Sequence, residues 1–274
     1  MIKIRLRNLK NDFKKLNIDG YVIPKNDEFF SEYSKKDRLK IISNFSGSAG
    51  FAVILKNKNF LFVDGRYTIQ AQIESGENFK IIEYQKIINC DLFRNLTLGI
   101  DPNLFTSSQI KRFFLKNNKI KEINENLIDK ISINRKNTSE PFYSLSKSVV
   151  GENYENKINK IRNILKENNS NYIFISAPEN VAWLLNIRGF DNPNSPIPNC
   201  HLFLDNKKNF FLIGEKKKIK NLHKEKKIKF NQVIEPEDFK KFIDKQMGKK
   251  IMIDIKTCSI FYENIFKRKF KILK

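Results

Sequence analysis

The feature that most constrains the fold is an order of elements that occurs twice along the 274 residues. In the first half, apolar residues at helical spacing over 6–16 precede a short apolar strand at 20–23, an irregular stretch and a hairpin. In the second half, a helix around 158–165, a strand at 172–175 and a hairpin within 201–213 follow in a similar order. Duplicated α/β domains, each a mixed β-sheet flanked by helices, explain this repetition better than one continuous fold.

The segment between the two halves is the best candidate for a domain boundary, because residues 134–151 show no sustained periodicity. We therefore expect a first domain at 1–135, a linker at 136–150 and a second domain at 151–274. The further expected elements are strands at 79–84, 97–100, 119–123, 228–233 and 251–255, and helices starting near residues 67, 107, 178 and 236.

The net charge of +22 invites a nucleic-acid interpretation, since lysines displace counterions from phosphates. Only ten of the 52 basic residues are arginine, the side chain that reads bases and forks onto phosphate. A bias of composition toward Lys, Asn, Ile and Phe is the simpler explanation, and we interpret the lysine cluster at 216–227 as a solvated face. Nucleic acid is therefore not expected as a partner.

The apolar runs and the cysteines limit the cellular compartments in which we expect this protein. No apolar run approaches the roughly 18 residues that a membrane span needs, so no membrane partner is expected. Three widely spaced cysteines, Cys90, Cys200 and Cys258, favour neither a disulfide framework nor a zinc site. These observations predict a cytoplasmic protein.

Two glycine-containing turns bracket the first hairpin. Residues 44–51 (NFSGSAGF) precede the strand 51–55, and residues 64–67 (DGRY) follow the strand 60–63. No Gly-Lys-Ser/Thr follows the first turn, which excludes a phosphate loop and favours a tight turn of small residues. In the second turn we expect Asp64 to cap the next helix and to pair with a guanidinium, with Gly65 at an unusual backbone angle.

The second half contains a candidate recognition loop. Arg188 and Asp191 are interpreted as a fixed charge pair, and the loop that follows contains three prolines. The alternative is an internal ion pair that only orients the loop. We expect Trp183 in the core rather than as a stacking platform, and we expect His201 and His223 to be packed or exposed rather than metal ligands.

Four separated motifs carry a resemblance to the creatinase/prolidase-type N-terminal domains of the Xaa-Pro aminopeptidases. They are the "GSAG" and "DGRY" turns, residues 126–131 (NLIDKI) at the end of the first half, and residues 182–191 (AWLLNIRGFD) in the second. The resemblance implies two similar domains of that type. It also implies that the catalytic metallopeptidase domain, with two divalent metals, commonly manganese, is missing from this chain.

The resemblance implies that this chain alone is not a peptidase: no catalytic residue and no metal ligand carries over. Asp64, Arg66, Tyr67, Arg188 and Asp191 are then candidates for substrate access or for domain and dimer contacts. The implied parent activity is release of an N-terminal residue ahead of proline from short peptides, and the implied partner is a second copy or a full-length homologue. The alternative is a free-standing degenerate module that binds and regulates such a homologue.

Overall fold

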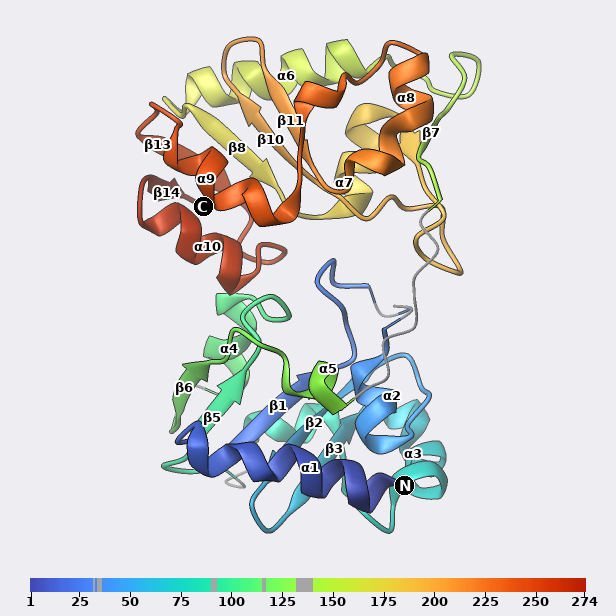
Figure 1. The fold of residues 1–274 in the computed structure, drawn as a ribbon, viewed down its shortest axis with the longest axis vertical. Helices are drawn as coiled ribbons and strands as arrows, with labels where there is room; N and C mark the ends of the chain where they lie inside the picture. The colour runs from blue at the N-terminus through green and yellow to red at the C-terminus, as the bar shows by residue number, and fades with distance from the viewer. Residues whose placement is uncertain (32, 34–35, 90–92, 115–116, 132–139) are drawn as a thin grey trace. The chain divides into compact units, whose positions relative to one another are not determined.

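The computed structural model describes residues 1–274 except 32, 34–35, 90–92, 115–116 and 132–139. The chain divides into two compact units, Met1–Lys136 and Asn137–Lys274 (Figure 1). Of the segment expected to be a linker, residues 136–139 lie outside the described part. Further along this segment, Phe142 is fully buried, and Tyr143–Ser144 forms strand β7.

The first unit is built on a six-stranded mixed sheet in the order β4-β3-β2-β1-β5-β6. Its strands are β1 Gly20–Pro24, β2 Gly50–Leu55, β3 Asn59–Val63, β4 Lys80–Glu83, β5 Thr97–Ile100 and β6 Lys119–Glu122. Its helices are α1 Ile2–Lys15, α2 Arg38–Ser43, α3 Thr68–Ser75, α4 Ser107–Phe113 and α5 Leu127–Ile131, with 3-10 turns η1 Gly65–Tyr67 and η2 Tyr84–Asn89. The predicted hairpin is β2–β3, with Phe51 opposite Phe62.

The alternation of side chains along these strands gives the sheet two apolar faces. One face packs against α1 and α2, as Leu9 and Phe13 of α1 join Ile54 of β2 in one core (Figure 1). The opposite face is aromatic: the rings of Phe51 and Phe62 stack with their centroids 4.7 Å apart. Helices therefore cover the first sheet on both sides.

The second unit repeats this plan with the strand order β12-β11-β10-β8-β13-β14. Its strands are β8 Tyr172–Ile175, β10 His201–Asp205, β11 Phe210–Ile213, β12 Val233–Ile234, β13 Lys250–Ile253 and β14 Lys271–Leu273, and β7 pairs with β9 Ile187–Arg188 outside the main sheet. Its helices are α6 Tyr154–Glu167, α7 Pro178–Leu185, α8 Lys220–Lys224, α9 Phe239–Asp244 and α10 Ile260–Lys267, with 3-10 turns η3 Lys216–Ile219, η4 Phe230–Gln232 and η5 Pro236–Asp238.

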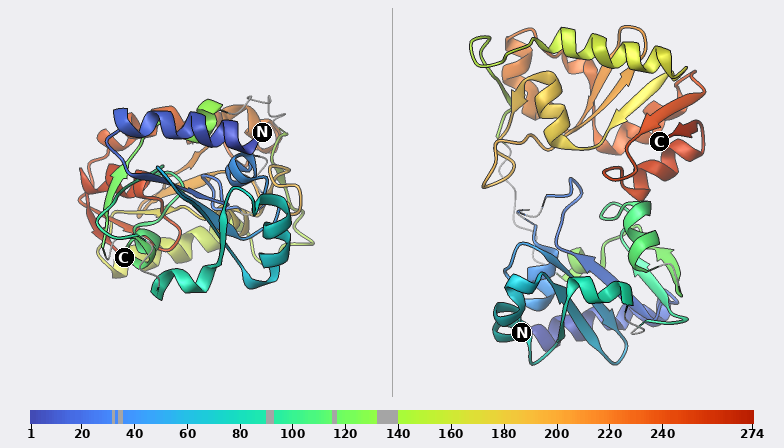
Figure 2. Two further views of the ribbon diagram at one scale, coloured as in Figure 1. Left: turned by 90° about the horizontal axis from the view of Figure 1, so that it is seen from below. Right: turned by 180° about the vertical axis from the view of Figure 1, so that it is seen from behind.

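The core of the second unit is divided by its sheet in the same way (Figure 2). Leu165 of α6 and Leu184 of α7 pack with Leu202 on one face. Phe239 of α9 and Phe266 of α10 pack with Phe203 on the other. The duplication predicted from the order of elements is confirmed by two sheets with the same strand order.

Some expectations need correction. Helix α2, which begins at Arg38, was not predicted, β12 is confined to Val233–Ile234 rather than 228–233, and β14 was not predicted. All ten glycines are described and none has a positive φ, so the unusual angle expected at Gly65 is wrong. Among the described residues no helix is long and apolar enough to cross a membrane. Cys200 and Cys258 are buried free thiols, and Cys90 lies outside the described part.

Candidate functional site

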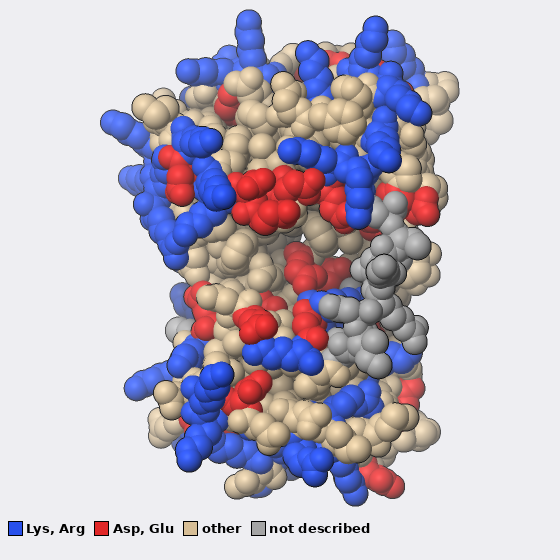
Figure 3. Space-filling view, viewed as in Figure 1, with Lys and Arg blue, Asp and Glu red and all other residues tan. Residues whose placement is uncertain are grey.

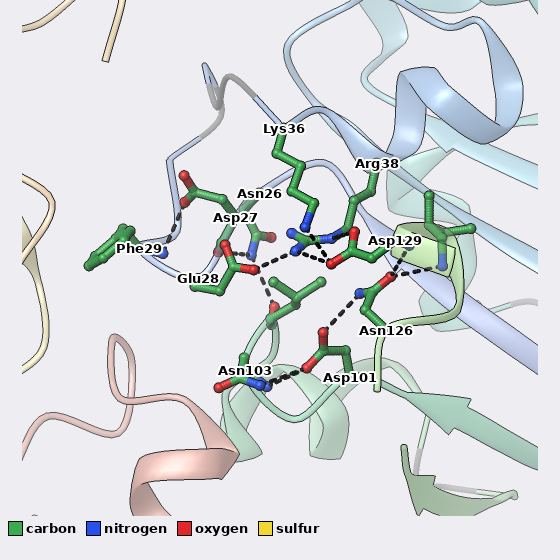
Figure 4. A network of polar contacts seen from close by, with 12 residues as sticks. Asn26, Asp27, Glu28, Phe29, Lys36, Arg38, Asp101, Asn103, Asn126 and Asp129 are labelled. Carbon is green, nitrogen blue, oxygen red and sulfur yellow. Dashed lines mark hydrogen bonds and ion pairs between the residues drawn. The ribbon is translucent and has the colours of Figure 1, made fainter. Parts of the chain in front are cut away.

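A network of charged side chains lies at the carboxyl end of β1 in the first unit, and Arg38 is its centre (Figure 4). Arg38 is the first residue of α2, which Asp37 caps by accepting a hydrogen bond from the Lys40 backbone N–H. Its guanidinium is 1% exposed and donates from Nε and Nη2 to the two carboxylate oxygens of Asp129, at 2.9 and 3.0 Å. Nη2 also pairs with Glu28. This forked geometry fixes the direction of the side chain as well as its charge.

The network continues from α5 to the end of β5. Asn126 accepts from the Ile128 backbone N–H at 2.9 Å and so holds the start of α5, the helix that carries Asp129. Its Nδ2 donates to Oδ2 of Asp101 at 2.8 Å, and Asp101 follows β5 directly. The side chains at the carboxyl ends of β1 and β5, which are parallel neighbours, are thereby connected by way of helix α5.

The electrostatics of the network keep its charges fixed. Burial favours the neutral form of Asp129, but hydrogen bonds from Arg38 and Lys36 outweigh it and lower the pKa of this carboxyl. Burial also opposes the charge on Arg38, yet Asp129 and Glu28 raise the pKa of the guanidinium. These groups stay ionised near neutral pH. They can orient a loop or a ligand, but they are poor proton donors and acceptors.

Residues 26–31, which follow β1, are held by further polar contacts (Figure 4). Oδ1 of Asp27 accepts hydrogen bonds from the backbone N–H groups of Phe29 and Ser31, both at 2.9 Å. Asn26 Nδ2 donates to the Leu104 carbonyl at 3.0 Å, which ties this segment to the chain after β5. Phe30 has a φ of 59°, a strained conformation for an aromatic residue that needs such support.

In the second unit the structure changes the partners expected for Arg188 and Asp191. Asp191 pairs with Lys218 Nζ at 2.8 Å, and the two side chains are 9% and 8% exposed. Arg188 instead donates from Nη1 to the carbonyls of Ala182 and Ile187, at 3.1 and 2.8 Å. The expected charge pair between Arg188 and Asp191 is therefore wrong.

The proline-containing loop after Asp191 is held at both of its ends. Oδ2 of Asp191 accepts from the Asn199 backbone N–H at 2.7 Å. The Gly189 N–H donates to the Pro196 carbonyl at 3.1 Å, and a Cβ added at Gly189 would lie 2.9 Å from Pro198 Cα. Only glycine fits at this approach, so the loop has little freedom.

The "DGRY" turn is the more exposed of the two sequence candidates. Asp64 caps η1 by accepting from the Arg66 backbone N–H at 3.0 Å, as predicted, and it pairs with the Arg66 side chain at 2.9 Å. The Arg66 side chain is 75% exposed, so its ion pair adds little to stability. Tyr67 Oη lies 3.0 Å from Ser48 Oγ and connects this turn to the "GSAG" turn.

Trp183 is 61% exposed, which overturns the expectation that it lies in the core. The ammonium group of Lys157, itself buried, lies 4.3 Å from the centre of the indole ring. His201 is buried, and its Nδ1 lies 2.7 Å from the Ser176 carbonyl oxygen. Within the described residues no three His, Cys, Asp or Glu side chains form a group that could hold a metal ion.

Sequence reasoning missed the Arg38 network altogether. Arg38 and Asp129 are 91 residues apart, and each has ordinary polar neighbours along the chain. A weak signal was available, because two acidic residues, Asp27 and Glu28, follow a strand end where polar side chains from neighbouring strands meet.

Two α/β units of one topology, with polar loops held at strand ends, define a class of duplicated α/β domains. Residues 133–274 match the family described as Creatinase/Prolidase N-terminal domain, and residues 5–131 match a second family of the same description. The first match covers more than half of the 274 residues, so the chain belongs to the Creatinase/Prolidase N-terminal domain family. The resemblance drawn from the four motifs is confirmed.

Named relatives are similar over most of this chain. Xaa-Pro aminopeptidase 1 of Dictyostelium discoideum is 30% identical over 288 residues, covering 95% of this chain and 46% of that protein. A probable Xaa-Pro aminopeptidase P of Pyricularia oryzae is 32% identical over 210 residues, covering 70% of this chain and 34% of that protein. The chain thus spans between about a third and a half of the length of these relatives.

A solved structure has the same fold. The X-prolyl aminopeptidase of Caenorhabditis elegans, described as a cytosolic enzyme with a di-nuclear active site, matches with a TM-score of 0.82 and 22% identity. The match covers 99% of this chain and 50% of that one.

Proposed function

We propose that this chain is the non-catalytic N-terminal part of an Xaa-Pro aminopeptidase, an enzyme that releases the N-terminal residue ahead of proline. The observation that carries the proposal is a match over 95% of the chain to less than half of such an enzyme. In the whole protein the two divalent metals, manganese by resemblance, would be held by a catalytic domain that corresponds to the part of the relative outside the match. A cytoplasmic location follows from the same relationship.

The role of the two units is to narrow substrate access and to support a dimer. The fixed charges around Arg38 and the loop held by Asp191 supply rigid polar surfaces at strand ends, where α/β domains commonly bind ligands. Such surfaces restrict a cleft because they do not yield to a longer peptide. Asp64, Arg66 and Tyr67 offer an exposed turn for a domain or subunit contact.

An assay with two separate polypeptides tests this proposal. One is this chain, and the other is the part of the Dictyostelium discoideum relative that the match leaves out. With manganese and peptides that have proline second, we expect no cleavage by this chain alone and cleavage by the other polypeptide. Adding this chain should shift cleavage toward the shorter peptides. The Arg38→Met variant of this chain, if folded, should shift cleavage toward shorter peptides less than the Arg66→Met variant does.

Each part of the proposal can fail separately. Metal-dependent cleavage by this chain alone would overturn the non-catalytic role. An unchanged length preference after mixing, with binding between the two polypeptides shown by sedimentation, would overturn the access role. The finding that this chain is monomeric at a concentration of tens of micromolar would overturn the role in dimerisation. The second candidate, a free-standing regulator, predicts instead that this chain binds the full-length relative and changes its rate.

A further inference from the structure

The segment from α8 to η4 in the second unit forms a small hollow that the proposed function does not use. His223, Lys226, Lys229, Phe230 and Asn231 line it, and its volume is about 450 Å³. We refer to it as the α8 pocket. All five of these residues are exposed, so the hollow is open to solvent.

An aromatic pair forms part of the lining. The ring centroids of His223 and Phe230 lie 4.3 Å apart with the planes inclined by 44°. Phe230 is 41% exposed, so a large part of its ring remains uncovered. An uncovered ring beside a hollow offers a face on which another flat ring can stack.

The backbone between α8 and η4 sets which lysines line the pocket. Lys226 has a φ of 58°, and its N–H donates to the His223 carbonyl at 3.0 Å. The next residue, Lys227, turns inward: its Nζ donates to the Asn186 carbonyl at 3.1 Å and lies 5.2 Å from the centre of the Tyr154 ring. Lys226 and Lys229 therefore remain at the pocket while the lysine between them is used in packing.

Two lysines that line the α8 pocket and two lysines of α8 itself have no acidic partner within ion-pair distance among the residues that the structure describes. Lys217 pairs with Glu215, and Lys218 pairs with Asp191 and Glu215. By contrast, within the described part of the chain no carboxylate lies within 4.0 Å of the ammonium groups of Lys220 and Lys224, at the two ends of α8, or of Lys226 and Lys229. Figure 3 shows Lys and Arg side chains gathered over the α8 end of this unit. A bound anion would relieve their mutual repulsion.

We propose that the α8 pocket binds single-stranded nucleic acid, with one base stacked on Phe230 and His223 and with phosphates near Lys226 and Lys229. Lys220 and Lys224 supply further phosphate contacts, so the footprint extends beyond one nucleotide. A duplex does not fit this chemistry, because its bases are already stacked on one another. Lysine without arginine predicts little sequence preference. The composition of the chain disfavours a nucleic-acid partner, but composition does not contain the positions of the lysines in space.

The test is fluorescence anisotropy with a labelled 12-nucleotide oligothymidine and the whole chain at 50 mM salt. With about four phosphate contacts, raising the salt to 200 mM should weaken binding roughly fiftyfold. Phe230→Leu should weaken it roughly tenfold by removing the stacking face. Lys226→Gln together with Lys229→Gln should lower both the affinity and the steepness of the salt dependence.

The matched control is Lys207→Gln together with Lys208→Gln, two exposed lysines in the β10–β11 hairpin of the same unit. The control should change affinity less than twofold. An equal loss in the control would overturn the proposal in favour of diffuse charge attraction, and so would no binding at about 100 micromolar protein. Adenosine monophosphate that binds as tightly as the oligonucleotide would overturn the single-strand assignment. None of these outcomes depends on the aminopeptidase relationship.

Discussion

The two units share a scaffold and differ at the carboxyl ends of their strands. In both units the first strand of the repeat is followed by a helix, α2 or α7. Each helix ends at an asparagine with a left-handed backbone, Asn44 with a φ of 68° and Asn186 with a φ of 52°. Thirteen residues separate β1 from α2, but only Ser176 and Ala177 separate β8 from α7. Part of the charged network of the first unit is formed by residues of this longer segment between β1 and α2.

A further pair of corresponding residues shows what the repeat retains. Asp101 follows β5 and accepts from the Asn103 N–H at 2.9 Å, and Asp254 follows β13 and accepts from the Lys256 N–H at 2.9 Å. Asp101 is linked onward through Asn126 toward the Arg38 network, whereas Asp254 accepts from Thr257 Oγ1, which lies 2.8 Å from Ser176 Oγ. The same turn thus leads to different polar partners in the two units, which locates specialisation in loops rather than in the sheets.

The largest expected effect is on the first unit, in Arg38→Met. Methionine keeps most of the volume but leaves Asp129 partly buried without its fork, and losing one partner of a buried pair costs about 3–5 kcal/mol. We expect a loss near the lower end, because Asp129 also contacts Lys36. Trp183, the only tryptophan, reports unfolding of the second unit in urea, and amide exchange reports the first.

In that experiment the transition of the second unit should not move. Arg66→Met is the control, since its ion pair is exposed, and it should leave both transitions unchanged. Equal effects of the two substitutions would show that burial of Arg38 does not distinguish the two sites.

The corresponding experiment in the second unit is Lys218→Met. Asp191 is then left buried without its cation, which should cost about 3 kcal/mol in the transition reported by Trp183 fluorescence. The Asn199 amide, which donates to Asp191, should exchange faster. Lys217→Met is the control, because Lys217 is exposed and pairs with the exposed Glu215. A stable Asn199 amide in the variant would show that the loop does not depend on this pair.

The units should also differ in acid, because His201 begins β10 where Phe51 begins the apolar part of β2. Burial lowers the pKa of His201 to about 4, below the usual 6.5, so the unfolded state binds the proton first. The contribution of neutral His201 is complete above pH 6.5 and is lost as the pH falls toward 4. The full loss is about 3 kcal/mol.

Unfolding in urea at a series of pH values between 4 and 7 measures this effect in the second unit. The His201→Gln variant should flatten the pH dependence in that window, while any acid sensitivity of the first unit should remain. A variant that keeps the slope of the original protein would show that other groups cause it.

The sequence predicted most of the scaffold because its signals are local. The 3,4,3 spacing in α1, the apolar runs of the two hairpins and Pro178 at the start of α7 each depend on neighbours along the chain. Helix α2 escaped prediction because it has six residues and begins with a charged side chain that only tertiary contacts bury. Strand β14 escaped because it has three residues and pairs only with β13.

The candidate site was less predictable, because its partners are distant. Asp191 pairs with Lys218, 27 residues away, although Arg188 is the nearer cation in sequence. Trp183 has apolar neighbours along the chain, which predicted burial, but it lies on the outer side of α7. The sequence motifs were enough to indicate the family. The partners of charged side chains and the exposure of Trp183 became visible only in the tertiary structure.

The smallest expected effect comes from exchanging a residue between the units. Asp19 accepts from the Thr97 N–H at 2.9 Å and pairs with Lys56, and Asn171 accepts from the N–H groups of Lys249 and Lys250. Both residues thereby hold the start of a central strand. Asp19→Asn keeps an acceptor for Thr97 and removes the ion pair, so it should cost less than about 1 kcal/mol.

The dependence on salt and pH distinguishes the ion pair of Asp19 with Lys56 from its hydrogen bond with the Thr97 N–H. The hydrogen bond from Lys56 lowers the pKa of Asp19, so its charge stabilises the fold above the usual carboxyl pKa and this contribution is lost as the pH falls through the lowered value. The cost of Asp19→Asn should therefore shrink in 1 M salt and in acid, measured by urea unfolding of the first unit. A cost that persists in both conditions would mean that the Thr97 hydrogen bond, rather than the ion pair, was lost. In that case both units would hold a strand by a hydrogen bond from a backbone N–H group to a side chain, and Asp19 could not be replaced by the asparagine that serves at position 171.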